Sequence, residues 1–217
     1  MKKLVSTLAI SAVAVSAFAQ GTINVANNGT TLVSQWASAA DHTLSSVAAN
    51  GGKVQFFAAP DGTAFSALGA LVTTGNAQGF ALAYASQSLW MAANPSWNAY
   101  QIGSVAPIAG RFVAGTATVS PLAAGGKIEY VLAGWTGTSA TLDAAITAGA
   151  SIGQSALYTG VATGNPTTTP IPGTPTALTD TFTGMTLAPQ ATITPEPSTF
   201  ALAGLGAAAM LILRRRK

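Results

Sequence analysis

Side chains that could do acid–base or nucleophilic chemistry are few in this 217-residue chain. His42 is the single histidine, it follows Asp41, and there is no cysteine. No Gly-x-Ser-x-Gly sequence stands at a predicted strand-to-helix turn, so nothing would present a serine to His42 for nucleophilic catalysis. One histidine without cysteines cannot build a typical zinc site, and the carboxylates are too scattered in sequence for a calcium loop. We therefore expect no catalytic residue, no metal and no cofactor.

A pair of carboxylates that hydrolyses glycosidic bonds is the enzymatic alternative that the sequence leaves open. Such a pair needs only to meet in space, and spacing along the chain does not limit that distance. Glu129 and Asp143 would be an arbitrary choice among the acidic residues. Without a feature that selects a pair, we expect the protein not to be an enzyme.

Three large aromatic residues flank an Asn-Pro turn: Trp90, Trp97 and Tyr100. Aromatic faces beside amide groups are suited to stacking against sugar rings, so these residues are candidate sugar contacts. The alternative is that they pack in the core, because aromatic side chains bury large areas. Trp36 and Trp135 are predicted to be core residues.

Short β-prone runs separated by glycine and proline predict the elements that would position these side chains. The strongest is Lys127–Trp135, in which Lys127 and Glu129 share one face and Ile128 and Tyr130 the other. This spacing predicts an all-β fold, a β-sandwich of jelly-roll or immunoglobulin-like type. The other expected strands are 22–26, 53–58, 79–84, 100–105, 111–119 and 178–187.

One short helix is expected over Ser139–Ala148, capped by Ser139 or Thr141 and closed by Gly149. Turns are expected at Pro60-Asp61-Gly62 and over 121–126, and an extended loop rich in threonine and proline over 165–175.

The N-terminus has the three parts of an export signal. Lys2 and Lys3 precede the apolar run Leu4–Phe18, and small residues at Ala17 and Ala19 suit a signal peptidase. The run is shorter than the roughly 20 apolar residues that span a membrane. We predict a cleaved signal peptide over residues 1–19, with an uncleaved membrane helix as the alternative.

The C-terminus carries a second set of targeting features. Pro195, Glu196 and Pro197 precede Ser198–Leu213, which has no charged residue. As a helix with about 1.5 Å rise per residue, this run would reach roughly 24 Å, slightly less than a hydrocarbon core of about 30 Å. Basic residues that follow such a helix stay on the cytoplasmic side of the membrane and stop its passage. We expect this role for Arg214, Arg215, Arg216 and Lys217.

Through these residues the chain resembles the PEP-CTERM family, whose members are substrates of exosortase. The resemblance implies cleavage near Pro195-Glu196-Pro197 by that membrane-embedded, cysteine transpeptidase-like protease, with the catalytic groups in the protease. The implied route uses the export machinery and signal peptidase, then a transient inner-membrane anchor, and ends at the cell surface or in the extracellular matrix. We predict a structural surface or matrix protein, with an exopolysaccharide-binding module as the alternative.

The charge balance fits an extracellular body and excludes nucleic acid as a partner. Between Gln20 and Thr194 three cations face five anions, a net charge of −2, so the sequence pI of about 9.5 comes from the two ends. A nucleic-acid-binding protein needs a clustered basic face. The predicted division is a signal peptide over 1–19, a β-sandwich body over 20–188, a tether over 189–194 and the sorting segment over 195–217.

Overall fold

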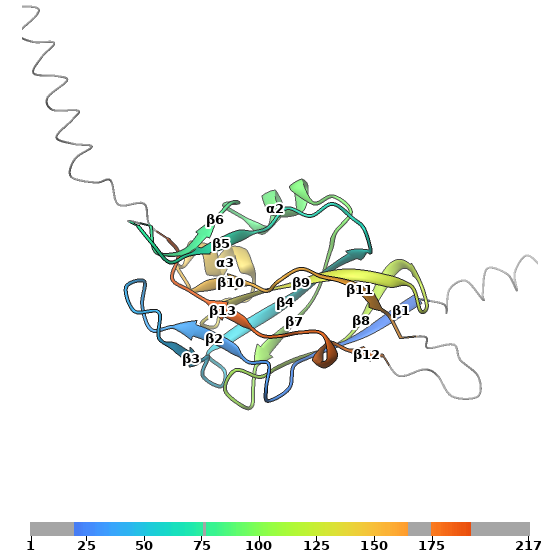
Figure 1. Cartoon of the computed structure of the whole chain (residues 1–217), viewed down its shortest axis with the longest axis horizontal. Helices are drawn as coiled ribbons and strands as arrows, with labels where there is room; N and C mark the ends of the chain where they lie inside the picture. The colour runs from blue at the N-terminus through green and yellow to red at the C-terminus, as the bar shows by residue number, and fades with distance from the viewer. Residues whose placement is uncertain (1–19, 76, 165–174, 192–217) are drawn as a thin grey trace, which may run out of the picture.

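The computed structural model describes residues 20–75, 77–164 and 175–191 (Figure 1). These residues are mostly β, with two short α-helices, α2 (Gln87–Ala93) and α3 (Leu142–Thr147), and one 3₁₀ turn, η1 (Leu178–Asp180). The strands are β1 (Gln20–Ala26), β2 (Val33–Trp36), β3 (Leu44–Ser46), β4 (Gly52–Pro60), β5 (Gly69–Val72), β6 (Gly79–Leu82), β7 (Asn98–Val105), β8 (Phe112–Ala123), β9 (Lys127–Thr136), β10 (Ile152–Gln154), β11 (Tyr158–Ala162), β12 (Thr176–Ala177) and β13 (Met185–Leu187).

One large sheet runs through the middle of the body. Its strand order is β10-β9-β4-β7-β8-β1-β12, and β11 pairs with another part of β9. A small sheet of β13, β2 and β3 lies on one side, and the β5–β6 hairpin lies with α2 and α3 on the other (Figure 1). The mostly-β architecture agrees with the all-β prediction, while the jelly-roll or immunoglobulin-like sandwich stays a prediction.

Both faces of the large sheet are buried. Successive residues of a strand point to opposite faces. Phe56 and Phe57 of β4 accordingly belong to two separate hydrophobic clusters, and so do Tyr130 and Val131 of β9. Glu129 lies on the face opposite Ile128 and Tyr130, as its spacing predicts, but it is only 3% exposed because this face is covered as well. Covering on both faces explains why these central strands have nearly continuous apolar sequences.

The predicted short helix is confirmed as α3. The hydroxyl of Thr141 accepts the N–H of Ala144 at 3.2 Å, and Gly149 ends the helix with φ of +68°. Helix α2 was not predicted. Its first turn is capped by Ser86, whose hydroxyl accepts the N–H of Leu89. Serine is a preferred N-cap residue, so Ser86 was the local signal for this helix start.

Two predicted segments differ from the structure. The expected turn over 121–126 begins later, because β8 continues to Ala123, which pairs with Gln20 of β1. The expected strand over 178–187 is η1 followed by the much shorter β13, since the N–H of Phe182 bonds to the Leu178 carbonyl at 2.8 Å. The apolar residues of this segment, Phe182, Met185 and Leu187, are all buried.

The predicted signal peptide, sorting motif and membrane segment lie outside the described residues, as does 165–174 of the expected loop. None of the helices in the described part of the chain is long and apolar enough to cross a membrane. The predicted tether is described only at Pro189–Ala191, and these three residues hydrogen-bond to the body.

Candidate functional site at the C-terminal end of the body

The chain leaves the described body along β6, held there by backbone hydrogen bonds. The N–H of Phe80 donates to the Pro189 carbonyl at 2.8 Å, and the N–H of Ala191 donates to the Phe80 carbonyl at 3.0 Å. Just before this point, Ala188 and Ile152 exchange two hydrogen bonds of 2.8 and 2.9 Å. We call Pro189–Ala191 the C-terminal clamp.

The side chain of Gln190 ties the clamp to α3. Its amide donates to the carbonyls of Ile146 and Ala150, at 2.8 and 3.3 Å. Ile146 belongs to the last turn of α3 and Ala150 to the connection that follows it, so the amide contacts both the helix end and the loop beyond it. Gln190 thus joins the end of α3 to the segment that leads to the sorting motif.

Gly79 allows the clamp to lie close to β6. A Cβ atom at this position would come within 2.2 Å of the Pro189 carbonyl oxygen, and Gly79 has φ of +130°. Any other residue would be strained there and would collide with the clamp. The close approach fixes where the chain leaves the body.

The aromatic candidates do not form a binding surface. Trp90 and Trp97 are 1% and 3% exposed, and their indole N–H groups donate to the carbonyls of Ser66 and Ala64. Tyr100 packs beside the core cluster on the other face of the large sheet. The sugar-contact prediction is therefore not supported, since both tryptophans fill the core instead. The core roles of Trp36 and Trp135, at 7% and 0% exposure, are confirmed.

His42 takes part in local packing. Its ring stacks on Trp36 with centroids 3.9 Å apart, and its Nε2 lies 3.1 Å from the Ala39 carbonyl oxygen. The neighbouring Asp41 accepts both the N–H and the hydroxyl of Thr43, which lowers the pKa of that carboxyl. The carboxylate of Asp41 therefore serves a turn and does not orient the imidazole.

One Gly-x-Ser-x-Gly sequence does occur in the chain and has the spacing of a nucleophile turn. It is Gly-Ala-Ser-Ile-Gly at residues 149–153. They connect α3 to β10, however, so the order is helix-to-strand, the reverse of the arrangement that exposes a nucleophile. The N–H of Ser151 donates to the Thr136 hydroxyl at 3.1 Å. The segment is a connection within the fold.

The carboxyl group of Glu129 is affected by its surroundings at the turn after β4, where Asp61 lies nearby. Burial raises the pKa of Glu129, N–H donors of Thr63 and Gly62 oppose this effect, and the charge of Asp61 adds to it. Asp61 itself accepts the N–H of Gly160 at 2.7 Å. Oε1 of Glu129 has no hydrogen-bond partner among the described residues.

Glu129 is expected to make stability depend on pH. Its folded pKa lies above the ordinary 4.5, so the folded state binds this proton more tightly. The contribution of this proton to the stability of the folded state is complete below pH 4.5 and is lost as the pH rises through the folded pKa of Glu129. Glu129→Gln stays neutral, so its free energy of unfolding should fall less than that of the wild type as the pH rises above 4.5 and through the raised pKa of Glu129.

Denaturant unfolding at several pH values measures this slope, and Asp180→Asn, at an exposed carboxyl, is the matched control. Equal slopes for Glu129→Gln and the wild type would show that the buried carboxyl carries no linked proton.

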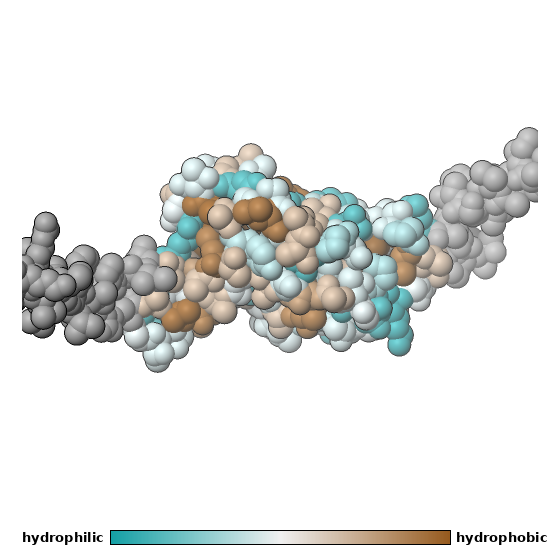
Figure 2. Space-filling model, turned by 90° about the horizontal axis from the view of Figure 1, so that it is seen from above, coloured by the Kyte–Doolittle hydropathy of each residue, from teal (hydrophilic) through white to brown (hydrophobic). Residues whose placement is uncertain are grey.

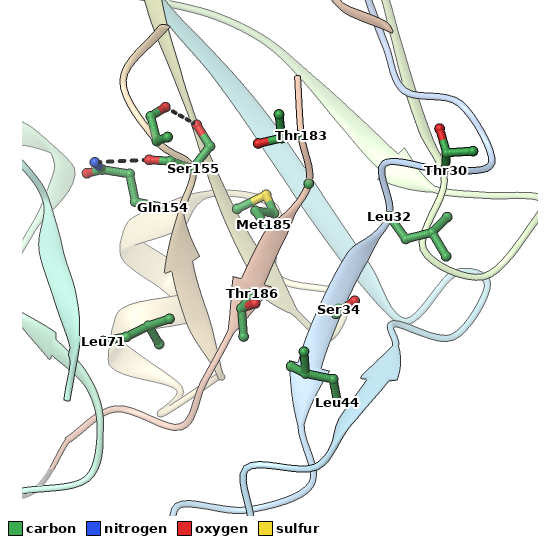
Figure 3. A pocket seen from close by; sticks show the side chains of 12 residues that line it. Thr30, Leu32, Ser34, Leu44, Leu71, Gln154, Ser155, Thr183, Met185 and Thr186 are labelled. Atoms are coloured by element: carbon green, nitrogen blue, oxygen red, sulfur yellow. Dashed lines mark hydrogen bonds between the residues drawn. The ribbon is translucent and has the colours of Figure 1, made fainter. Parts of the chain in front are cut away.

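A shallow groove of about 510 Å³ lies between the small sheet and β5 (Figure 3). Leu44 and Leu71 flank it on either side of β13, and its lining contains no charged residue. Its larger polar groups are already paired: Gln154 accepts the N–H of Leu68, and Ser155 accepts the N–H of Leu132. The groove therefore offers few free donors or acceptors to a ligand. The remaining lining residues are Thr30, Leu32, Ser34, Ala156, Thr183, Gly184, Met185 and Thr186.

Comparison with known proteins identifies the segment that follows the clamp. The model of the PEP-CTERM protein-sorting motif matches residues 194–217, which confirms the resemblance found in the sequence. No curated protein and no solved structure matches the chain. The motif implies exosortase as the processing partner, and it implies export with membrane-associated sorting to the cell surface.

Proposed function

We propose, from the PEP-CTERM motif at the C-terminus of this chain, that the protein is a structural component of the bacterial cell surface or extracellular matrix. After export and removal of residues 1–19, the apolar segment holds it in the inner membrane. Exosortase then cuts near Pro195-Glu196-Pro197 and frees the body. The observation that carries the proposal is the motif match over 194–217, beginning three residues after Ala191.

The motif suits a protease because of its two prolines. Each fixes φ and lacks a backbone donor, so the peptide around Glu196 favours an extended form that an active site can thread. The nucleophile belongs to exosortase, and this chain contributes the peptide that is cut. With no cysteine of its own, the chain has no thiol to compete in such a reaction.

A passive role for the body is supported by how its few reactive groups are used. His42 is stacked on Trp36, Glu129 is buried, and Trp90 and Trp97 are packed in the core. Few charges lie on the body, so its surface depends on neutral hydroxyl and amide groups and should tolerate changes of salt. Such a surface suits a protein that sits among extracellular polymers.

Truncation tests the anchoring step. Deletion of Pro195–Lys217 keeps the clamp, so the body should still fold and should appear in the soluble periplasm or medium instead of the membrane fraction. The control is Arg214→Lys, Arg215→Lys and Arg216→Lys together, which keeps the basic end and should be sorted like the wild type. A truncated protein that stays with the membrane fraction would show that another part of the chain anchors it.

A further inference from the structure

We propose that, before cleavage, the end of the body that carries the β5–β6 hairpin and the end of α3 faces the outer surface of the membrane. We call this the exit end; its residues are 69–75, 77–82, 146–150 and 189–191. The inference rests on the proposed function, because it requires the tail to be held in the membrane. Its partner is a lipid headgroup surface.

The spacer between the body and the apolar segment is short. Ala191 is bonded to Phe80, and only Thr192, Ile193 and Thr194 separate it from Pro195. At most about 3.5 Å per residue, the chain from Ala191 to Ser198 reaches about 25 Å. This limit follows from the number of residues alone, whatever conformation the stretch adopts. The point where the chain leaves the body must therefore lie close to the headgroups.

The clamp determines which part of the body is near that point. It is fixed by backbone bonds to Phe80, by the Gln190 amide on Ile146 and Ala150, and by the close contact at Gly79. Since these contacts join it to both β6 and α3, the spacer cannot be lengthened without breaking several of them. The hairpin and the end of α3 are thus the parts nearest to the membrane.

The exit end has a neutral surface that can approach lipid without electrostatic penalty. Its described residues include no charged side chain, and Leu71 is 42% exposed. Hydrophobic residues are scattered among residues of intermediate hydropathy in the view of Figure 2, without one continuous apolar face. The tether, and not charge or hydrophobic insertion, would hold this end at the membrane. The arrangement should therefore be insensitive to salt and to anionic lipid content.

The opposite end of the body is distant from the exit end. The chain enters at Gln20, and the turn after β8 lies beside it, away from the β5–β6 hairpin (Figure 1). Strand β8 runs toward that turn over 12 residues, a length of about 40 Å at roughly 3.3 Å per residue. Ser120, exposed near the end of β8, and Thr73, exposed in the hairpin, are therefore suitable probes.

Because the chain has no cysteine, Thr73→Cys and Ser120→Cys each give one labelling site. Each variant of the chain without its signal peptide, residues 20–217, is labelled with a donor dye, incorporated in phosphatidylcholine vesicles and measured with an acceptor on the lipid headgroups. Transfer from position 73 should be at least about twofold stronger than from position 120, since the positions differ by a large part of the body length. Insertion of 20 Gly/Ser residues after Ala191 adds about 25 Å of flexible chain and should remove the difference.

Equal transfer from both positions without the insertion, or stronger transfer from position 120, overturns the proposal. A chain of residues 20–217 that does not enter the vesicles also overturns it, since no membrane then holds the exit end. This experiment contains no exosortase. Failed cleavage in cells would thus count against the proposed function alone, while equal transfer with normal cleavage would count against the orientation alone.

Discussion

Glu196→Ala in the full-length chain leaves the Arg214–Lys217 tail attached to the exported protein. Pro195-Glu196-Pro197 belongs to the matched motif, and Glu196 is the one charged group among these three residues. Loss of a hydrogen bond to a charged group costs about 1.5–3 kcal/mol, so tail removal should slow by on the order of tenfold or more. A pulse-chase experiment with mass detection of the C-terminal peptide in the native cells measures the rate.

Thr192→Ser is the matched control, because it changes the spacer and leaves Pro195-Glu196-Pro197 intact. It should be processed at the wild-type rate. If Glu196→Ala is also processed at that rate, cleavage does not depend on the motif, and the proposed route is wrong.

Trp90→Ala is expected to destabilise the body by about 3–5 kcal/mol, the usual cost of removing a large buried aromatic side chain. Trp90 is 1% exposed, lies edge-on to Phe57 with centroids 4.6 Å apart, and donates to the Ser66 carbonyl at 2.7 Å. The free energy of unfolding of the 20–194 body, from chemical denaturation, measures the loss.

The control for Trp90→Ala lies next to it on the same helix. Leu89 is 55% exposed, so Leu89→Ala should change stability by no more than about 0.5 kcal/mol. A loss below about 1 kcal/mol for Trp90→Ala would contradict the core assignment. Polysaccharide binding that Trp90→Ala abolished without unfolding would restore the sugar-contact hypothesis.

The elements that were predicted correctly have strong local signals. In α3, Thr141 and Gly149 mark both ends of a short apolar pattern, and the structure uses them as caps. Strands β4 and β9 are long, β-prone runs, and nine residue pairs join them. Local chemistry is enough in these cases, because each segment favours the same conformation that the fold requires.

The elements that were missed are held by distant partners. β2 pairs in parallel with β13, and most of the chain separates these two strands in sequence. β10 pairs with β9 over only three residues. Strands this short have little periodicity of their own. Gly153 of β10 lies where a Cβ would come within 2.0 Å of the Thr186 carbonyl oxygen, a contact that sequence spacing cannot reveal.

Burial was the main property that the sequence did not determine. Trp90 and Trp97 had both an exposed and a buried interpretation, and the choice depended on Phe57, Phe65 and the loop carbonyls that meet them in space. Glu129 alternates correctly within β9, but a second layer covers its face of the sheet. The sorting motif was readable because its function depends on a short contiguous peptide.

Intact-mass spectrometry of the mature protein from its native cells tests the central claim, that this chain is delivered and then cut, most directly. The account predicts a mass that begins at Gln20 or Gly21 and ends near Pro195-Glu196-Pro197, without the Arg214–Lys217 tail. A mature mass that still includes Arg214–Lys217 would contradict it.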